Sequence, residues 1–268
     1  MSFESSAEQQ AEQQAQLSKR QQEILALVED HGFVATEQLV ESFGVTPQTI
    51  RRDINLLCDR HLLQRFHGGA GRPTSTENEP YPERRRAYHL GKKKIGELVA
   101  KDIPDGASLF INIGTTTEAV SEALLQRKNL RVVTNNLNVA RILSANASFE
   151  ILIAGGELRA RDGGIVGQTA ANFVSRFRLD YGIIGVSGIE VDGSLLDFDA
   201  RETEISQLIM QHSERLLLVA DQSKFGRRAM IRFGSVADVD ELYTDTELAE
   251  PYLATLHKAN VNIHIAGN

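Results

Sequence analysis

The sequence has one cysteine, no tryptophan and no apolar run long enough to cross a membrane. The single Cys58 excludes an internal disulfide and a zinc site built from several cysteines. The seven histidines form no pair with the spacing of metal ligands, so we expect no metal site and no other cofactor. The Glu- and Gln-rich N-terminus lacks the apolar core of a signal peptide, from which we expect a cytoplasmic protein.

The chain also lacks an excess of basic residues. Its formal net charge is -7 over 268 residues, which does not favour a nucleic-acid binder. The length is sufficient for two domains, and 41% hydrophobic with 24% charged residues is ordinary for a globular protein. Composition therefore indicates a globular chain of about two domains, and its chemistry must be sought in local motifs.

Residues 46–55 predict an amphipathic helix. Thr46 is a suitable N-cap, and Pro47 suits the first helical position, where its missing N–H has no partner anyway. At about 100° per residue, one face is apolar and consists of Ile50, Ile54 and Leu57. The other face carries side chains that hydrogen-bond to bases or phosphates, namely Gln48, Thr49, Arg51, Arg52 and Asn55. This pattern predicts a DNA recognition helix, and the alternative is a surface helix whose polar face is only solvated.

The neighbouring sequence favours DNA binding. Ser18 and Gln21 form a capping box for a helix that runs to about residue 30. Thr36 begins a short second helix, and Gly44 supplies the tight turn before the recognition helix. Residues 62–70 form an extended run into a double-glycine turn, as in a β-hairpin wing. We therefore predict a winged helix-turn-helix whose further DNA contacts are Thr36, Thr46, Arg65 and His67.

The charge of this region is balanced. Residues 18–72 contain seven basic and seven acidic side chains. The bases gather on the recognition helix and wing, whereas several acids lie on the first two helices. DNA binding then requires the bases to share one face, because phosphate contacts supply most of the sequence-independent attraction.

Composition divides the rest of the chain. Residues 1–16 are polar and repeat Ala-Glu-Gln-Gln, so we expect disorder or a frayed helix. We predict the winged domain over residues 17–71, a Pro-rich linker over 72–82 and a larger domain over 83–268. Residues 83–102 predict one helix with a basic first half, which is either solvated or helps to hold DNA phosphates or to pack between the domains.

Extended apolar runs alternate with helical or loop segments from residue 107 onward. These runs are residues 109–113, 131–134, 150–154, 181–186, 216–220, 242–244 and 261–265. Near-continuous apolar strands of this kind predict an α/β domain with a largely parallel sheet covered on both faces. Its ligand is expected in the loops that follow the carboxyl ends of the strands.

The loops after these strands carry residues suited to a phosphorylated ligand. After Gly114, residues 115–117 are three threonines, which form either a capping box with Glu118 or an anion cradle at a helix N-terminus. We favour the cradle. The full set of predicted ligand-binding residues in these loops is Gly114, Thr115, Thr116, Thr117, Asn135, Asn136, Gly155, Gly156, Arg159 and Lys224. For the two asparagines and for Gly155 and Gly156 the alternative is a simple turn. For Lys224 the alternative is an ordinary surface lysine.

Residues 197–202 support two interpretations. Asp199 and Glu202 fit a helix N-cap and its third residue. As carboxylates beside a phosphate site they also suit the hydroxyl groups of a polyol, so we include both among the ligand-binding residues. With Asp197 they are the candidates for a general acid and base, which keeps a sugar-phosphate isomerase-like enzyme as an alternative. No nucleophile elbow or nucleotide-binding loop is present, and we expect no catalytic residues.

The order of these motifs resembles the DeoR family of bacterial transcriptional repressors. The resemblance covers about residues 17–265 and rests on VTPQTIRRD (45–53), HGGA (67–70), IGTT (113–116), TNNL (134–137), AGGEL (154–158), DGG (162–164), FD (198–199) and SKFG (223–226). The sequence departs from the family pattern at Asp197, where Glu is expected, and at Ala200, where a bulkier residue is expected.

The resemblance implies a particular fold and function. The larger domain is expected to be a ribose-5-phosphate-isomerase-like α/β effector domain. It is expected to bind glycerol 3-phosphate or a related phosphorylated polyol and thereby to release the repressor from operator DNA of glycerol metabolism genes. Membership also implies a homo-oligomer, either a dimer or a tetramer.

Overall fold

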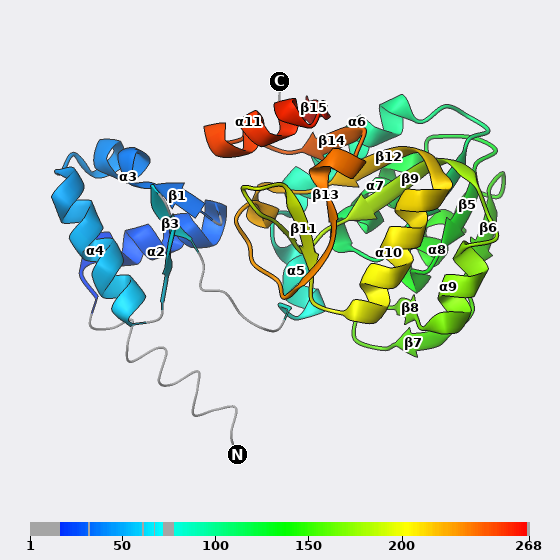
Figure 1. The fold of residues 1–268 in the computed structure, drawn as a ribbon, viewed down its shortest axis with the longest axis horizontal. Coiled ribbons are helices and arrows are strands. Elements are labelled where there is room, and N and C mark those ends of the chain that lie inside the picture. The colour runs from blue at the N-terminus through cyan, green and yellow to red at the C-terminus, as the bar shows by residue number, and fades with distance from the viewer. Residues whose placement is uncertain (1–16, 32, 61, 67, 72–77, 267–268) are drawn as a thin grey trace, which may run out of the picture. The chain divides into compact units, whose positions relative to one another are not determined.

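The structure is a computed structural model that describes residues 17–31, 33–60, 62–66, 68–71 and 78–266 (Figure 1). The chain divides into two compact units, Met1–Thr74 and Ser75–Asn268. Each unit has its own hydrophobic core. The disorder predicted for residues 1–16 lies outside the described residues.

The described part of the first unit has three helices and a three-stranded sheet. In chain order the elements are α2 (Lys19–His31), β1 (Phe33–Ala35), α3 (Thr36–Phe43), α4 (Pro47–Asp59), β2 (Gln64–Phe66) and β3 (Gly69–Gly71). β3 lies between β1 and β2 and is antiparallel to both. The predicted winged helix-turn-helix is confirmed, and β1 is an addition whose three residues are too few to show a strand periodicity.

Local sequence signals set the ends of these helices. Both bonds of the predicted capping box form, from N of Ser18 to Oε1 of Gln21 at 3.0 Å and from N of Gln21 to Oγ of Ser18 at 3.3 Å. Gly44 ends α3 with φ 62°, a left-handed conformation that glycine adopts without strain. The three helices enclose a core whose most buried side chains are Ile24, Val28, Leu39, Ile50 and Leu57.

The second unit is built on a seven-stranded sheet. Its strands are β4 (Ser108–Ile111), β5 (Arg131–Thr134), β6 (Glu150–Ile153), β9 (Leu179–Gly185), β12 (Ser213–Val219), β14 (Glu241–Thr244) and β15 (Asn262–Ile265). Each of the seven apolar runs in the sequence forms one of these strands, in the spatial order β15-β14-β12-β9-β4-β5-β6. Every neighbouring pair is parallel, as continuous apolar strands predict.

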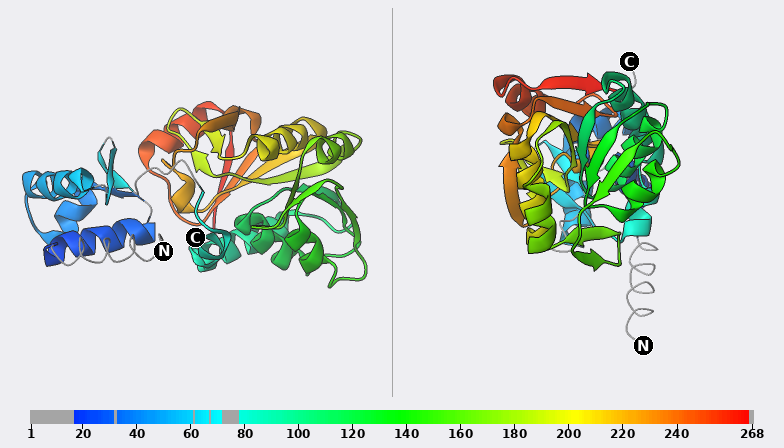
Figure 2. Two further views of the ribbon diagram at one scale, coloured as in Figure 1. Left: turned by 90° about the horizontal axis from the view of Figure 1, so that it is seen from below. Right: turned by 90° about the vertical axis from the view of Figure 1, so that its right-hand side faces the viewer.

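Alternate strand residues bury the two faces of this sheet. Leu109 and Ile111 of β4 pack in one core with α6 (His89–Asp102), α7 (Thr115–Leu124) and α8 (Leu137–Leu143). Phe110, which lies between them in sequence, packs in the other core with α9 (Gln168–Val174), α10 (Ala200–His212) and α11 (Glu250–Lys258). Helices therefore cover both faces of the sheet, as the right-hand view of Figure 2 shows.

The single helix predicted over residues 83–102 is wrong, because two helices cover this stretch. α5 (Tyr81–Arg86) ends at Ala87, which is extended, and Tyr88 has φ 54° before α6 begins. Lys92 of α6 is 3% exposed, and its Nζ donates to the carbonyl oxygens of Arg84 and Ala87. These carbonyls lie at the C-terminal end of α5, where a helix leaves acceptors without partners, so Lys92 ties α6 to that end.

Short elements that the sequence did not predict complete the second unit. β7 (Glu157–Arg159) and β8 (Gly164–Val166) form an antiparallel pair. A small antiparallel sheet contains β10 (Gly188–Ile189), β11 (Ser194–Asp197) and β13 (Ile231–Ser235). Two single-turn helices, η1 (Gln222–Lys224) and η2 (Val236–Asp238), follow β12 and β13.

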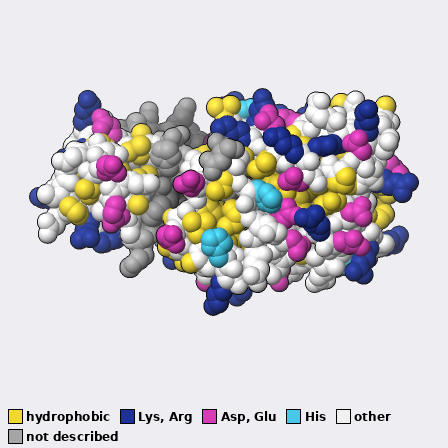
Figure 3. Space-filling view, turned by 90° about the horizontal axis from the view of Figure 1, so that it is seen from above, with side chains coloured by type: hydrophobic (Ala, Val, Ile, Leu, Met, Phe, Trp, Pro, Cys, Tyr) yellow, Lys and Arg dark blue, Asp and Glu magenta, His cyan; other side chains and the backbone are white. Residues whose placement is uncertain are grey.

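The surface carries no simple charge asymmetry on the face drawn in Figure 3, where acidic and basic side chains are interspersed. Hydrophobic side chains lie between them on the second unit (Figure 3). None of the described helices is long and apolar enough to cross a membrane.

Candidate DNA-binding surface and ligand pocket

The polar face of α4 is open to solvent. Thr46 caps the helix by accepting a hydrogen bond from N of Thr49 at 3.3 Å, and Pro47 is its first residue, as predicted. Thr49 is half-buried, and the exposed side chains of this face are Gln48, Arg51, Arg52 and Asn55. These donors and acceptors are available to the base edges or phosphates of a duplex.

Asp53 is the one acidic side chain in the middle of α4, and it is buried. It is 6% exposed, and its two oxygens accept hydrogen bonds from Nε of Arg20 at 2.6 Å and Nε2 of Gln21 at 2.9 Å. These bonds join α4 to α2 and remove the carboxylate from the face proposed for phosphates. A count of charges along the sequence misses this pairing, because Asp53 and Arg20 are 33 residues apart.

The other predicted DNA contacts differ in exposure. Arg65 of β2 is exposed, and its Nη1 donates to Oδ1 of Asn55 at 2.9 Å, which joins the wing to α4. Thr36 is 7% exposed, and its backbone N donates to the carbonyl oxygen of Gly68 at 2.8 Å. The Thr36 side chain therefore has little surface to offer a duplex. His67 lies outside the described residues.

A cavity of about 320 Å³ lies at the carboxyl ends of central strands in the second unit. β4 and β9 are neighbours, yet the chain continues from β4 toward β5 on one side and from β9 toward β12 on the other. Such a switch point is where open α/β sheets hold ligands. Of the predicted ligand residues, the cavity wall contains Gly114, Thr115, Thr116, Arg159, Asp199, Glu202 and Lys224.

The N-terminus of α7 forms part of this wall. Gly114 is the N-cap, so the alternative interpretation, a capping box between Thr115 and Glu118, does not hold. Glu118 instead accepts hydrogen bonds from Tyr81 Oη at 2.8 Å and from Asn138 Nδ2 at 3.0 Å. Thr117 is fully buried, and its hydroxyl donates back to the carbonyls of Asn112 and Gly114. Of the three threonines, Thr115 and Thr116 face the cavity, where the first N–H groups of a helix favour an anion.

Besides Thr117, four predicted ligand residues are not part of the cavity wall. Asn135 is buried, and its Nδ2 donates to the carbonyl oxygen of Ile165 at 3.1 Å. Asn136 caps α8 by accepting hydrogen bonds from the first backbone N–H groups of that helix. Gly155 and Gly156 lie in an exposed loop after β6. The side chains of Asn135 and Asn136 therefore form hydrogen bonds with backbone groups, and the two glycines belong to a loop.

Arg159 is surrounded by carboxylates rather than free to bind an anion. It forms a bidentate pair with Asp162, with both distances 2.9 Å. Its Nη1 lies 2.7 Å from Asp199 and its Nη2 lies 2.5 Å from Glu202. Burial raises the pKa of Asp199, but hydrogen bonds from Arg201 and Arg159 outweigh it and lower that pKa to about 2. Arg159 thus fixes three carboxylates in the cavity wall, two of which were predicted there.

Asp197 and Glu202 are two interacting acidic residues of the wall. Asp197 is 7% exposed and accepts hydrogen bonds from Ser187 Oγ at 3.1 Å and from Phe198 N at 2.6 Å. Burial raises the pKa of Asp197, and burial together with the Asp197 charge raises the pKa of Glu202 to about 8, against the opposing effect of Arg159. The raised pKa favours the protonated form of Glu202, which can donate as well as accept a hydrogen bond.

Lys224 and Arg227 supply the cations that lack a carboxylate partner. Among the described residues, neither forms an ion pair within 4.0 Å. Arg227 donates to Asn78 Oδ1 at 3.0 Å and lies over the ring of Phe198 at 5.2 Å. Burial lowers the pKa of Lys224 to about 8, although Asp221 acts in the opposite direction. Arg227 was not predicted, and only its place three residues after Lys224 hints at it.

Part of the predicted linker also forms the cavity wall. The lining residues from this stretch are Asn78, Glu79, Pro80, Tyr81 and Pro82, and Arg84 beyond it also lines the cavity. Arg84 belongs to the basic run after the linker, and its Nε donates to the carbonyl oxygen of Glu79 at 3.0 Å. Composition predicted a linker here because prolines and polar residues show no periodicity, and that signal does not distinguish a free linker from an ordered wall.

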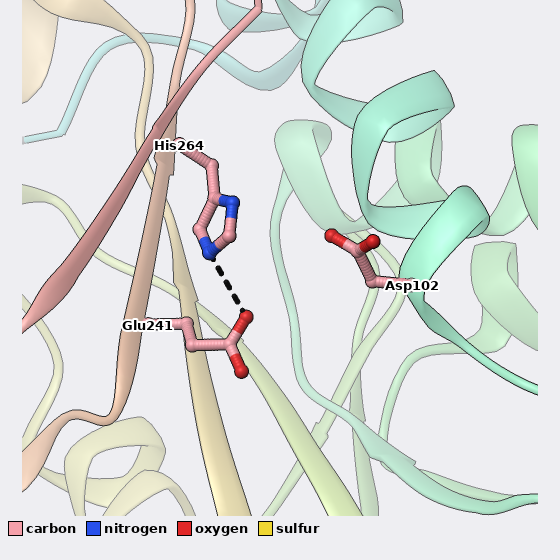
Figure 4. A group of neighbouring side chains, drawn as sticks. All are labelled: Asp102, Glu241 and His264. Atoms are coloured by element: carbon pink, nitrogen blue, oxygen red, sulfur yellow. Dashed lines mark ion pairs between the residues drawn. The ribbon is translucent and has the colours of Figure 1, made fainter.

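A separate cluster of possible metal ligands joins α6, β14 and β15. Figure 4 shows Asp102, Glu241 and His264, whose nearest oxygen and nitrogen atoms all lie within 4.8 Å of one another. The hydroxyl of Tyr243 lies 2.9 Å from Asp102 and 2.6 Å from Glu241, and Arg215 also pairs with Glu241. These contacts are those of an ion-pair network. No spacing in the sequence revealed the cluster, and the expected absence of a metal stays a prediction.

Comparison with protein families assigns both units. The family model described as "DeoR-like helix-turn-helix domain" matches residues 20–76, and that described as "DeoR C terminal sensor domain" matches residues 88–246. The chain belongs to the DeoR family. This DeoR-family protein is therefore a helix-turn-helix transcription regulator with a C-terminal sensor domain for a small-molecule effector.

Relatives of this DeoR-family protein are transcriptional repressors. The "Glycerol-3-phosphate regulon repressor" of Escherichia coli is 52% identical over 85% of this chain and 90% of its own length. The protein of the same name from Haemophilus influenzae is 53% identical over 85% of this chain and 89% of its own length. Among solved structures, ribose 5-phosphate isomerase A from Neisseria gonorrhoeae is 18% identical, with a TM-score of 0.38 over 51% of this chain and 53% of that chain.

Proposed function

We propose that the chain represses genes of glycerol and glycerol 3-phosphate metabolism and that glycerol 3-phosphate in the cavity releases it from operator DNA. As a repressor of transcription it acts in the cytoplasm. A homo-oligomer presents two α4 helices to operator half-sites that lie about 34 Å apart, or a multiple of that distance. The exposed polar face of α4 supports the DNA contact.

The charges of the cavity wall are the observation that carries the effector assignment. Lys224, Arg227 and the N-terminus of α7 suit a phosphate group. Asp199 and Glu202, both fixed by Arg159, suit the hydroxyl groups of a polyol. The volume of about 320 Å³ is at the small end of ligand pockets. A short molecule with a phosphate and adjacent hydroxyls meets all of these requirements.

The names of the relatives support the choice among phosphorylated polyols. Two relatives at 52% and 53% identity are named for the glycerol-3-phosphate regulon. Another phosphorylated sugar of similar size is the alternative, because the wall selects a phosphate and hydroxyl groups rather than one carbon skeleton.

Two measurements test this function together. First, a DNA sequence that the chain binds is selected from a random pool. The dissociation constant for this DNA is then measured with and without glycerol 3-phosphate. Hundredfold weaker DNA binding with ligand corresponds to a coupling free energy of about 2.7 kcal/mol. Thermal unfolding with the same ligand is expected to shift upward with concentration, because binding to the folded state alone stabilises it.

Glycerol and inorganic phosphate are the matched controls, since each supplies one half of the ligand. We expect neither to weaken DNA binding at concentrations where glycerol 3-phosphate does. An unchanged dissociation constant for DNA with saturating glycerol 3-phosphate contradicts the effector assignment. If another sugar phosphate weakens DNA binding and glycerol 3-phosphate does not, that compound is the effector.

A further inference from the structure

A run of basic residues at the start of the second unit is not explained by the ligand cavity. Residues 84–94, here called the basic run, contain six basic side chains and no acidic one. Two of the six have a place in the fold, because Arg84 lines the cavity and Lys92 is buried against the end of α5. The other four are exposed, together with the histidine between them: Arg85, Arg86, His89, Lys93 and Lys94.

The fold offers these exposed charges few partners. Lys93 lies 3.9 Å from Glu97, but both side chains are more than half exposed, so the pair contributes little to stability. Among the residues that the structure describes, Arg85, Arg86 and Lys94 form no ion pair within 4.0 Å. The dipole of α5 favours cations in its last turn, but no such effect favours cations near the N-terminal end of α6. Repulsion among these charges thus favours an anionic partner outside the chain.

DNA is the anion that the chain itself brings to the basic run. The first unit is a helix-turn-helix that binds DNA. Its last strand ends at Gly71 and α5 begins at Tyr81, so the connection spans at most about 35 Å even if fully extended. A short tether gives a second contact an effective concentration in about the millimolar range. Contacts between cations and phosphates that are weak by themselves are then occupied.

The charge of the first unit leaves room for such a contribution. Residues 18–72 contain equal numbers of basic and acidic side chains, and the whole chain has a formal net charge of -7. Phosphate contacts supply essentially all of the sequence-independent affinity of a DNA-binding protein. A balanced unit on a negative chain therefore gains from cations that lie close to it in sequence and have no acidic neighbours.

We infer that Arg85, Arg86 and Lys94 form a second DNA contact, on the second unit, which binds phosphates of the same duplex as α4. The inference rests on the DNA-binding half of the proposed function and does not depend on the effector. The contact raises the affinity for every DNA sequence equally, because the phosphates are the same at each base pair. α4 then supplies the sequence preference, and the basic run supplies part of the general attraction.

The test compares two variants of the full chain. The run variant carries Arg85→Gln, Arg86→Gln and Lys94→Gln. The control variant carries substitutions of exposed cations elsewhere on the second unit, namely Lys128→Gln, Arg176→Gln and Arg178→Gln. Both variants lose the same net charge. Fluorescence anisotropy measures the dissociation constant for the selected DNA and for an unrelated duplex of equal length, between about 50 and 200 mM salt.

We expect the run variant to bind both duplexes about ten- to a hundredfold more weakly at about 0.1 M salt. The slope of log affinity against log salt concentration is expected to become shallower by about 2 to 3, because each lost phosphate contact contributes about 0.9. The ratio of the affinities for the two duplexes is expected to stay that of the wild type. The control variant is expected to keep the wild-type slope to within about 0.5.

Each other outcome overturns the inference in a recognisable way. An unchanged slope in the run variant removes the contact, and an equal decrease in the control variant reduces it to an effect of net charge. A changed ratio between the duplexes means that base recognition was disturbed instead. Light scattering measures the mass of each variant, and a smaller oligomer in the run variant assigns these cations to an interface between copies of the chain.

Failure of the proposed function is separate from failure of the inference. If the wild type binds neither duplex, both fail together. If the wild type binds DNA and the run variant matches its slope, the inference alone fails. Should the run variant not fold, Arg85→Gln alone decides against Arg176→Gln alone, with an expected decrease in slope of about 0.9 for the first and none for the second.

Discussion

Lys224→Met is expected to make the protein more stable and at the same time unresponsive to its effector. Lys224 is 9% exposed, and burial lowers its pKa from 10.5 to about 8. A difference of about 2.5 pKa units corresponds to about 3 kcal/mol against the charged lysine in the folded state at neutral pH. Methionine removes the charge and keeps a similar length, so we expect the free energy of unfolding to rise by about 1 to 3 kcal/mol.

The same pKa shift predicts how the stability difference between the wild type and Lys224→Met changes with pH. Below pH 8 Lys224 is protonated in both the folded and the unfolded chain. The buried charge then lowers the free energy of unfolding by its full amount. Between pH 8 and 10.5 the folded protein releases this proton while the unfolded chain keeps it, so wild-type stability from this group rises with pH. The advantage of Lys224→Met is therefore expected to be largest at pH 7 and to shrink as pH rises above 8.

Urea denaturation at pH 7 and at pH 9.5 measures this difference. Lys101→Met, an exposed residue of α6, controls for the loss of one positive charge. The same variant is expected to bind glycerol 3-phosphate more weakly by about 1.5 to 3 kcal/mol, because a charge-assisted hydrogen bond to phosphate is lost. DNA binding without ligand is expected to be unchanged. A destabilised Lys224→Met, or one that retains full affinity for the ligand, would refute the reasoning.

Three further substitutions test other contacts. Arg52→Ala is expected to weaken operator binding by about 1 to 3 kcal/mol in a fluorescence-anisotropy titration. A loss of affinity that varies with the base pair identifies a base contact, whereas an equal loss on every DNA sequence identifies a phosphate contact. Unchanged affinity would remove Arg52 from the interface. Asp53→Ala is expected to lower the free energy of unfolding in urea by about 1 to 3 kcal/mol, because the buried amide of Gln21 loses its acceptor. An equal effect of the exposed Asp59→Ala would contradict this. Asp197→Asn is expected to move the pKa of Glu202 from about 8 toward its usual value in a carboxyl NMR titration, and an unmoved pKa would exclude Asp197 as a cause.

The parts of the fold that repeat along the sequence could be predicted from it. Every apolar run assigned to the central sheet forms a strand of that sheet, because burial on both faces demands continuous apolar residues. The end of α3 at Gly44 and the start of α4 at Thr46 follow from backbone conformation and capping, which depend on neighbouring residues only. β1 and β11 were not recognised in the sequence, and both lie outside the central sheet.

The wall of the cavity could be predicted only in part. The loops after β4 and β12 both contribute residues to the cavity wall, since the carboxyl ends of parallel strands share one edge of the sheet. Asn136 follows β5 at the same edge, but its side chain turns back to cap α8. Arg84 and Arg227 could not be recognised, because their roles depend on contacts between segments far apart in the chain. No local property of the sequence contains that information.

The ordered stretch from Asn78 to Arg84 has a practical consequence for protein engineering. A hybrid regulator made by fusing this sensor to a different DNA-binding domain keeps its complete cavity wall only if the junction lies upstream of Asn78. A junction at residue 82, where composition places the end of the linker, would exchange Tyr81 and with it the hydrogen bond to Glu118. Fusion partners should therefore be joined before Asn78 rather than after Pro82.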